Sequence, residues 1–350
     1  MVSNTAASGR GIGTGLSKPR RALFIATAAL LGVAASVAIA ELALRATGHR
    51  PWRNLGLNAY QPTMFTPDPE LGWRPAPGTY LVPPFAPDGP TTRLTVLPDG
   101  ARSTGEATNP RTRMAMFGCS FTQGVGISDD ETFAWRLQRA FPNVQVLNHG
   151  VGAYGTYQSL LLMQRFFAAS EPPAVVLYGL IEEHEPRNIA DPDWLRVLDL
   201  YSKEEMIATP YCTLARDDAL VCHRPESYPR WPLRQDLALI PFLESRYLRV
   251  HAGDRAAQAR VVTERLLVEM QQLAQRHGSH FCVVLLHFSA AAKQHYVEFL
   301  TQQHIDFVDC AFPITAEMRV YGDTHPNGAM NARYAECIAA RLSAAGWLSQ

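Results

Sequence analysis

The sequence of 350 residues predicts an α/β protein, a doubly wound three-layer α/β/α sandwich preceded by one membrane-spanning helix. From residue 111 onward, short and almost continuously apolar runs alternate with stretches of helical periodicity, as expected of parallel strands buried on both faces. Apolar residues make up 47% of the chain and charged residues 18%, which is a globular composition. A long uncharged run stands near the N-terminus and predicts the membrane helix.

That run, residues 22–40, is long enough to cross the hydrocarbon core of a bilayer as a helix. Three basic residues precede it, so the positive-inside rule predicts a cytoplasmic tail (1–21), a transmembrane anchor (22–44) and export of everything that follows. A cleavable signal peptide is the alternative, because residues 38–40 fit a small-x-small cleavage site. The run exceeds the usual apolar region of a signal peptide, which favours a single-pass protein of the cytoplasmic (inner) membrane with its body on the periplasmic or extracellular side.

Charge and proline content describe the next part of the chain. Basic and acidic residues both number 32, and the first 50 residues hold six of the basic ones and one acid. The exported body is therefore mildly acidic, and no nucleic-acid partner is expected.

Residues 51–110 contain 12 prolines, which forbid long helices and central strands. We expect residues 45–110 to form a Pro-rich stalk or a small irregular β module, draped over the domain that follows.

The following domain (111–347) alternates strands and helices. The expected strands are Met114–Cys119, Val144–Asn148, Ala174–Leu180, Phe281–His287 and Asp306–Asp309. The expected helices are Thr132–Ala140, Thr156–Ala169, Arg255–His277, Ala292–Gln303 and Asn327–Ala345. Such alternation gives a parallel sheet with right-handed crossovers, and ligands bind at the carboxyl ends of its strands. Residues 190–253, rich in Trp, Tyr and Pro, interrupt the pattern as an insertion, which is a candidate cap over the ligand site.

The six cysteines stand in a chain whose export would place them in an oxidising compartment. Cys212 and Cys222 flank a stretch in which two aspartates can make a hairpin turn, so we expect them to form a disulfide. Cys337 lies in a helical pattern that leaves its state undecided. Three others fall in apolar strand-like runs, where a buried free thiol is the commoner outcome: Cys119, Cys282 and Cys310.

Three loops after the predicted strands carry groups suited to catalysis. Ser120 follows the first strand, where backbone amides can support a nucleophile, although a turn serine is an equally good local interpretation. His325 precedes the last helix as a possible general base, with Asp323 placed to orient its imidazole. In the alternative interpretation Asp323 or Thr324 caps that helix and His325 is a bystander, and both interpretations can hold together. Glycines in the loop 150–155 bring backbone N–H groups close to a substrate oxygen.

Taken together, these loops resemble the GDSL/SGNH hydrolase superfamily. The similar blocks are the nucleophile block at 118–122 (GCSFT), the glycine block at 148–154 (NHGVGAY) and the closing block at 323–327 (DTHPN). Their order and strand context match over about residues 111–345. Upstream, 71–75 (LGWRP) and 99–102 (DGAR) resemble the lead-in of membrane-anchored bacterial members.

The resemblance implies a flavodoxin-like, five-stranded parallel sheet, that is, the SGNH hydrolase fold. It also implies a triad of Ser120, His325 and Asp323 that acts on ester bonds without a metal or another cofactor. The expected partners are ester-bearing small molecules, lipids or glycans, and the membrane through the N-terminal helix.

The sequence departs from the family pattern once in the nucleophile block and once in the glycine block. Cys119 replaces the aspartate that usually precedes the serine. A cysteine nucleophile is disfavoured, because residue 119 should point to the opposite side of the strand end. Ala153 stands where the family has its oxyanion glycine. The backbone N–H groups of Ser120 and Ala153 are still expected to bind the oxyanion.

A third departure concerns the remaining oxyanion donor. Where the family has Gly-x-Asn-Asp, Glu182 occupies the asparagine position, and an ionised carboxylate can only accept hydrogen bonds. We expect the donor one turn later, at Asn188 or His184, and favour Asn188 because an amide donates at any pH. The sequence thus predicts a serine esterase. Its alternatives are an O-acyltransferase of envelope polysaccharide and a catalytically inactive binding module, the latter motivated by the altered third block.

Overall fold

The structure is a computed structural model that describes residues 17–53, 64–201 and 208–348. Most of the predicted cytoplasmic tail (1–21) lies outside the described residues, as does the part of the predicted stalk or β module at 54–63. The chain divides into two compact units. The anchor unit holds residues up to 53 together with 230–244, and the sheet unit holds the rest.

The anchor unit is built on α1 (Lys18–Ala46), which is long and apolar enough to cross a membrane, as a signal sequence also would be. Near its end, the Glu41 carboxylate accepts hydrogen bonds from the backbone N–H groups of Ala238 and Leu239, each at 2.9 Å. These groups belong to the start of α7 (Leu239–Ala252), and an acidic side chain is a favourable cap for a helix N-terminus. Arg45 pairs with Glu41 and also donates to the Asp236 carbonyl.

The sheet unit contains the predicted parallel sheet, which confirms the fold class. Its strands are β5 (Thr112–Gly118), β6 (Val144–Gly150), β7 (Val175–Ile181), β10 (His280–His287) and β11 (Asp306–Asp309). They lie in the order β11-β10-β7-β5-β6, with every pairing parallel. Numbered along the chain from the other edge, this is the flavodoxin-like order 2-1-3-4-5. The order reverses between β5 and β7, so a ligand crevice is expected above these two strands.

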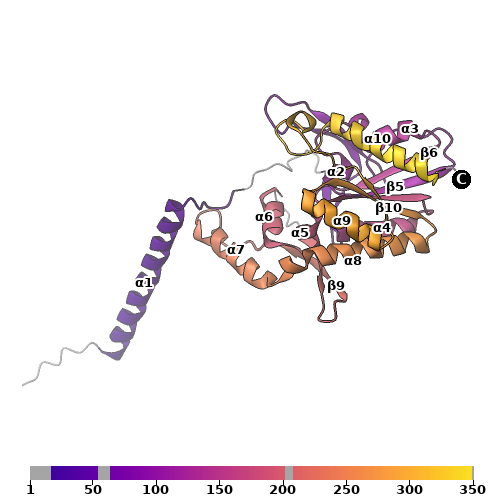
Figure 1. Ribbon diagram of the computed structural model, residues 1–350. Helices are drawn as coiled ribbons and strands as arrows, with labels where there is room; N and C mark the ends of the chain where they lie inside the picture. Colours follow the sequence, from indigo (N-terminus) through magenta and orange to yellow (C-terminus); the bar gives the residue numbers. More distant parts are fainter. Residues whose placement is uncertain (1–16, 54–63, 202–207, 349–350) are drawn as a thin grey trace, which may run out of the picture. The chain divides into compact units, whose positions relative to one another are not determined.

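Helices cover both faces of the sheet (Figure 1). One face is covered by α4 (Thr156–Ala169), α8 (Arg255–Arg276) and α9 (Ala290–Gln302). The other is covered by α3 (Phe133–Ala140) and α10 (Gly328–Ala345). The pleat explains this division: Ala115 and Phe117 of β5 pack on the first face, whereas Met114 and Met116 pack on the second. Strands buried on both faces must be apolar throughout, which is why the sequence pattern located them.

Two β-hairpins upstream of the sheet belong to the same unit. They are formed by β1 (Phe65–Asp68) with β2 (Gly72–Pro75) and by β3 (Gly78–Val82) with β4 (Thr92–Val96). Arg165 of α4 holds the first hairpin through both carboxylate oxygens of Asp68, at 2.7 and 2.9 Å. This bidentate pair lowers the pKa of the Asp68 carboxyl, although burial opposes the shift. Residues 64–110 thus contribute two hairpins to the sheet unit.

The insertion contributes short helices and one hairpin. The short helix α5 (His184–Asn188) precedes it, and its own elements before α7 are α6 (Pro192–Tyr201), β8 (Ala208–Leu214) and β9 (Leu220–Ser227). Cys212 and Cys222 are opposite each other in the β8–β9 hairpin and are joined by a disulfide. The Leu214 N–H donates to Gln258 of α8, and Cys212 packs in the core on this face of the sheet. This hairpin therefore extends the helical layer.

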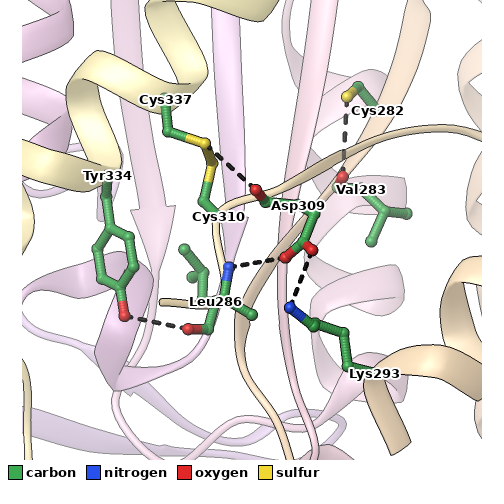
Figure 2. Close-up of a disulfide and its surroundings, with 9 residues drawn as sticks. Cys282, Val283, Leu286, Lys293, Asp309, Cys310, Tyr334 and Cys337 are labelled. Carbon is green, nitrogen blue, oxygen red and sulfur yellow. Dashed lines mark hydrogen bonds and ion pairs between the residues drawn. A yellow bond between two sulfur atoms is a disulfide. The ribbon is translucent and has the colours of Figure 1, made fainter. Parts of the chain in front are cut away.

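A second disulfide corrects the expectation of a free thiol at Cys310. Cys310, directly after β11, is bonded to Cys337 of α10 (Figure 2). The apolar surroundings are real, because Cys310 is fully buried, but they include a second cysteine from a helix 27 residues away. Sequence spacing carries no sign of that contact. The expectation of buried free thiols at Cys119 and Cys282 agrees with the structure.

The remaining short elements link strands to helices. They are α2 (Ser120–Gln123), the 3-10 turn η1 (Asp129–Glu131) and the 3-10 turn η2 (Ala316–Met318). The last of these lies in the loop between β11 and α10, which ends at Asn327. The Asn327 side chain accepts the N–H groups of Ala329 and Met330 and so fixes where α10 begins.

Candidate active site

Ser120 is the first residue of α2 and stands just beyond the carboxyl end of β5. The turn that places it there requires glycine at position 118, where φ is +149°. A Cβ atom at Gly118 would lie 2.2 Å from Thr122 Oγ1 and 2.9 Å from the Gly179 carbonyl oxygen. Gly118 therefore lets the chain leave β5 and turn directly into the helix that carries the serine. Ser120 sits at the switch point of the sheet, two residues after Gly118, which pairs with Gly179 near the carboxyl end of β7.

His325 and Asp323 meet this serine from the loop before α10. Nε2 of His325 is 2.8 Å from Ser120 Oγ, although the two residues are 205 positions apart in the chain. Nδ1 of the same ring contacts the Asp323 carboxylate, which also accepts the His325 backbone N–H at 2.8 Å. The structure thus brings together Ser120, His325 and Asp323 in the arrangement of a nucleophile, a base and a group that orients the base.

The charge of Asp323 suits this arrangement. Burial acts to raise the pKa of its carboxyl, but the hydrogen bonds from His325 and from the backbone N–H groups of its own turn outweigh burial, and the pKa is lowered. Asp323 is therefore ionised at neutral pH and can hold the Nδ1 proton of His325. The turn itself is fixed by the Val320 N–H, which donates to the His325 carbonyl at 2.8 Å.

The loop after β6 presents one unused backbone donor. From residue 150 to residue 155, every backbone N–H except that of Ala153 has an acceptor among the described residues. The acceptors belong to Asn148, Gly118, Gln123, Val151 and Gln158. Ala153 also has a φ of +70°, a left-handed conformation that is unfavourable for a residue with a Cβ atom. The open N–H and the strained backbone occur at the same residue. The Ser120 N–H, at the first position of α2, has no partner within its helix.

Three side chains hold this loop in place. Gln123 of α2 accepts the Gly152 N–H at 3.0 Å, and Trp73 of β2 donates from Nε1 to the Gly152 carbonyl at 3.2 Å. The Tyr154 hydroxyl donates to the Trp73 carbonyl, so hydrogen bonds run in both directions between the hairpin and the loop. Sequence reasoning missed these positioning roles. Trp73, a tryptophan in the lead-in block 71–75 of a proline-rich segment, is the signal that could have pointed to one of them.

Arg102 is a second upstream residue that supports the site. Its guanidinium is almost fully buried, pairs with Asp129 at 3.0 Å, and donates to the carbonyl groups of Gln123, Gly124 and Ile127. These carbonyls belong to the turn that leaves α2, so the cation fixes the carboxyl end of the nucleophile helix. A buried charge is tolerated here because all of its neighbours accept hydrogen bonds or carry the opposite charge.

Asn188 is not an oxyanion donor in this structure. Its amide nitrogen donates to Thr156 Oγ1 at 2.9 Å and to Thr263 Oγ1 at 2.8 Å, and its oxygen accepts the Tyr157 N–H. Both amide hydrogens are used, and the side chain is buried between α4, α5 and α8. The expectation was wrong because the polar face of α5 turns inward to join three helices.

His184 does not face Ser120 either. It is fully buried, and Nδ1 lies 2.8 Å from the Tyr178 hydroxyl in the sheet core. Burial lowers its pKa well below the ordinary histidine range, so the ring is neutral. Its Nε2 has no partner among the described residues and no access to solvent. His184 is a packed structural histidine.

The two other departures from the family pattern have structural explanations. Glu182 accepts the Ser289 N–H at 2.7 Å and the Ser289 hydroxyl at 3.2 Å, so its carboxylate caps the start of α9. Cys119 is fully buried in the core on the α3 and α10 face of the sheet and cannot reach a ligand.

No family model and no curated protein matches the chain. Among solved structures, TesA matches with a TM-score of 0.38 and 14% identity over 66% of this chain and 98% of that one. A lipolytic protein of the G-D-S-L family from Desulfitobacterium hafniense has a TM-score of 0.38 and 10% identity over 66% and 99%. The psychrotrophic esterase EstA from Pseudoalteromonas has a TM-score of 0.39 and 10% identity over 68% and 100%.

Proposed function

We propose that the chain is a membrane-anchored, exported serine hydrolase that cleaves ester bonds through Ser120, His325 and Asp323. One observation carries this proposal: the imidazole of His325 contacts Ser120 Oγ on one side and the Asp323 carboxylate on the other. A binding module has no need for a serine hydroxyl held in this way. The resemblance of the three sequence blocks to SGNH hydrolases supports the same chemistry.

The reaction begins when Ser120 Oγ attacks the ester carbonyl carbon. His325 takes the hydroxyl proton at Nε2, and Asp323 stabilises the imidazolium that forms. The tetrahedral intermediate collapses when His325 returns the proton to the leaving alkoxide, and an acyl group remains on Ser120. Water then attacks the acyl-enzyme with the same histidine as base, and the carboxylic acid leaves.

The developing oxyanion is bound by the backbone N–H groups of Ser120 and Ala153. The N–H of Ala153 is open in the described part of the chain, and the residue is held rigidly by Gly152 on one side and Tyr154 on the other. Preorganised donors of this kind stabilise charge in the transition state without reorganising. Cys119 has no part in the reaction.

The proposed location is the cytoplasmic membrane, with the sheet unit on its outer side. Two disulfides suit an oxidising compartment. Retention of α1 is supported by its helix, which continues through the candidate cleavage site at 38–40, and by Glu41, which caps α7.

The test uses the full-length chain in detergent with p-nitrophenyl acetate. We expect Ser120→Ala and His325→Ala to lower kcat by on the order of 10³-fold or more. Ser279→Ala is the matched control, because this buried serine donates only to the Pro173 carbonyl at the opposite end of the sheet. A fluorophosphonate should add its mass to Ser120 in the wild-type chain alone. Turnover above half of the wild-type rate in Ser120→Ala contradicts the mechanism, and an inactive, unlabelled wild-type chain favours the binding module.

A further inference from the structure

A second histidine–carboxylate pair lies at the same edge of the sheet as the triad. His287 is the last residue of β10, and Glu183 follows β7 by two positions. The sheet register pairs His287 with Ile181, so the two side chains extend from the carboxyl ends of neighbouring strands. Nδ1 of His287 is 3.1 Å from Glu183 Oε1. Ligands bind at this edge in sheets of this topology.

Phe121 connects this pair to the triad. The phenyl ring directly follows the nucleophile in sequence, lies 5.7 Å from the His325 ring and 5.5 Å from the His287 ring, and is almost fully buried. The two imidazoles therefore contact the same ring, and their centres cannot be more than about 11 Å apart. A substrate of the size of one sugar ring or larger, bound at Ser120, would reach both.

The pair repeats the chemistry of the triad with an unused nitrogen. In both histidines a carboxylate occupies Nδ1. Nε2 of His325 meets Ser120, whereas Nε2 of His287 has no partner among residues 17–53, 64–201 and 208–348. The His287 and Glu183 side chains are 42% and 48% exposed, so a ligand can reach them. An exposed ion pair contributes little to folding, which leaves its position at the strand ends without a structural purpose.

The charges around the pair favour a ligand that is neutral and polar. The hydrogen bond that His287 donates to the Glu183 carboxylate raises the pKa of His287 although burial lowers it, and the nearby Glu182 and Arg319 act in opposite directions. The Nε2 atom of the imidazole and the carboxylate offer two polar contacts side by side, and the carboxylate offsets the charge of the ring whenever the ring is protonated. A hydroxyl group both accepts and donates a hydrogen bond, and neighbouring hydroxyls on one molecule fit such a pair better than an ion or an alkyl chain does.

We propose that His287 and Glu183 form a binding subsite for the hydroxyl groups of a polyhydroxylated alcohol, such as a sugar, that is the alcohol part of the ester. This inference rests on the proposed function, because it places the alcohol relative to Ser120. The subsite holds the leaving alcohol in hydrolysis and the acceptor alcohol in acyl transfer, since the two occupy the same side of the acyl-enzyme.

The chain contains a matched control for this subsite. His295 of α9 pairs with Glu264 of α8, and its side chain is 39% exposed, close to the value for His287. This pair borders a groove of about 370 Å³ between the two helices, on the helical layer and not at the strand ends. His295→Gln therefore removes an equivalent pair without touching the edge of the sheet that carries Ser120.

The experiment compares two esters with full-length wild type, His287→Gln, Glu183→Gln and His295→Gln. The substrates are p-nitrophenyl acetate, whose alcohol has no further hydroxyl, and a monoacetylated glucose. We expect His287→Gln and Glu183→Gln to lower kcat/KM for the sugar ester about ten-fold, mainly through KM, and to change the value for p-nitrophenyl acetate less than two-fold. His295→Gln should leave both values unchanged. Thermal unfolding of each variant confirms that it is folded.

A second set of measurements tests whether the subsite binds the leaving alcohol or an acceptor alcohol. With p-nitrophenyl acetate as donor and methyl glucoside as acceptor, the ratio of acyl transfer to hydrolysis should fall in His287→Gln if the subsite serves an acceptor. An unchanged ratio, together with impaired cleavage of the sugar ester, assigns the subsite to the leaving alcohol alone. Equal effects on both esters, no effect on either, or a wild type that cleaves only p-nitrophenyl acetate overturn the inference. Ser120→Ala distinguishes this from failure of the proposed function, which would leave that variant active.

Discussion

Breaking the Cys310–Cys337 disulfide should destabilise the sheet unit strongly while leaving its chemistry nearly intact. The bond closes a loop of 27 residues that contains both Asp323 and His325. In the chain-entropy relation, a loop of this length corresponds to about 3.5 kcal/mol of stability at 25 °C. For a unit of this size, that loss corresponds to a fall in Tm of roughly 7–14 °C. The perturbation is the double substitution Cys310→Ala with Cys337→Ala, which leaves no polar atom in the core.

The effect on kcat should be small because other bonds fix the base. Figure 2 places the disulfide beside Asp309, whose carboxylate accepts the Ala311 N–H at 3.0 Å and pairs with Lys293 at 3.1 Å. Tyr334 of α10 also donates to the Leu286 carbonyl at 3.1 Å. At the far end of the loop, the Asn327 N–H donates to the Met318 carbonyl at 2.9 Å. We expect kcat at 25 °C to stay within about three-fold of wild type.

The assay combines thermal unfolding with ester turnover measured at rising temperature. Cys212→Ala with Cys222→Ala is the control, because its loop of 10 residues corresponds to about 2.7 kcal/mol in the same relation and contains no proposed catalytic residue. A Tm shift below about 3 °C in the Cys310/Cys337 variant would refute the loop-closure argument. A loss of kcat greater than ten-fold in folded protein would show that the disulfide positions the base as well.

Three further predictions test other parts of the structure. Trp73→Phe removes the Nε1 donor from the Gly152 carbonyl but keeps an aromatic ring against Tyr154. We expect kcat to fall roughly 5- to 20-fold with little change in KM. A fall of less than two-fold contradicts the role of Trp73 in positioning the loop. Burial lowers the pKa of His149 to about 4. Between that pH and about 6.5, the imidazole is therefore protonated in the unfolded chain but neutral in the folded chain. We expect roughly 3 kcal/mol of the free energy of unfolding, present above about pH 6.5, to be lost as the pH falls to about 4. His149→Gln should reduce this loss in urea unfolding measured across that range, and an unchanged pH dependence would exclude the assignment. The membrane fraction should contain the chain with α1 intact, and a mature N-terminus at Glu41 would refute the anchor.

The parts of the fold that could be predicted share one physical cause. Strands buried on both faces must be apolar along their whole length, and α4, which packs one stripe against them, keeps the predicted bounds Thr156–Ala169. The contact of His325 with Ser120 could be predicted for a related reason. Ser120 and His325 follow strands or precede helices at one edge of the sheet, and parallel topology brings those positions together.

The predictions that were wrong depend on which way a short segment faces. The spacing of His184 and Asn188 predicts one helical face, but nothing in it distinguishes a face turned to the substrate from one turned to α4 and α8. The prediction of a free thiol at Cys310 was wrong for a similar reason, because its disulfide partner in α10 is close in space but not in sequence. The role of Trp73 could not be predicted from the proline content of its segment. Proline content predicts that long helices are missing there, but not what the hairpins contact.

The site that emerges needs the upstream module as much as the sheet. A left-handed alanine costs about 1–2 kcal/mol relative to an ordinary backbone conformation, and such strain persists only where the surroundings determine it. At Ala153 the surroundings do so from two directions, since Gln123 of the nucleophile helix holds the Gly152 N–H and Trp73 of the first hairpin holds the Gly152 carbonyl. The strained residue is also the one whose N–H is left open in this loop of the described chain. The first hairpin therefore takes part in shaping the site, because Trp73 is one of the two side chains that hold the Gly152 peptide groups next to the proposed oxyanion donor.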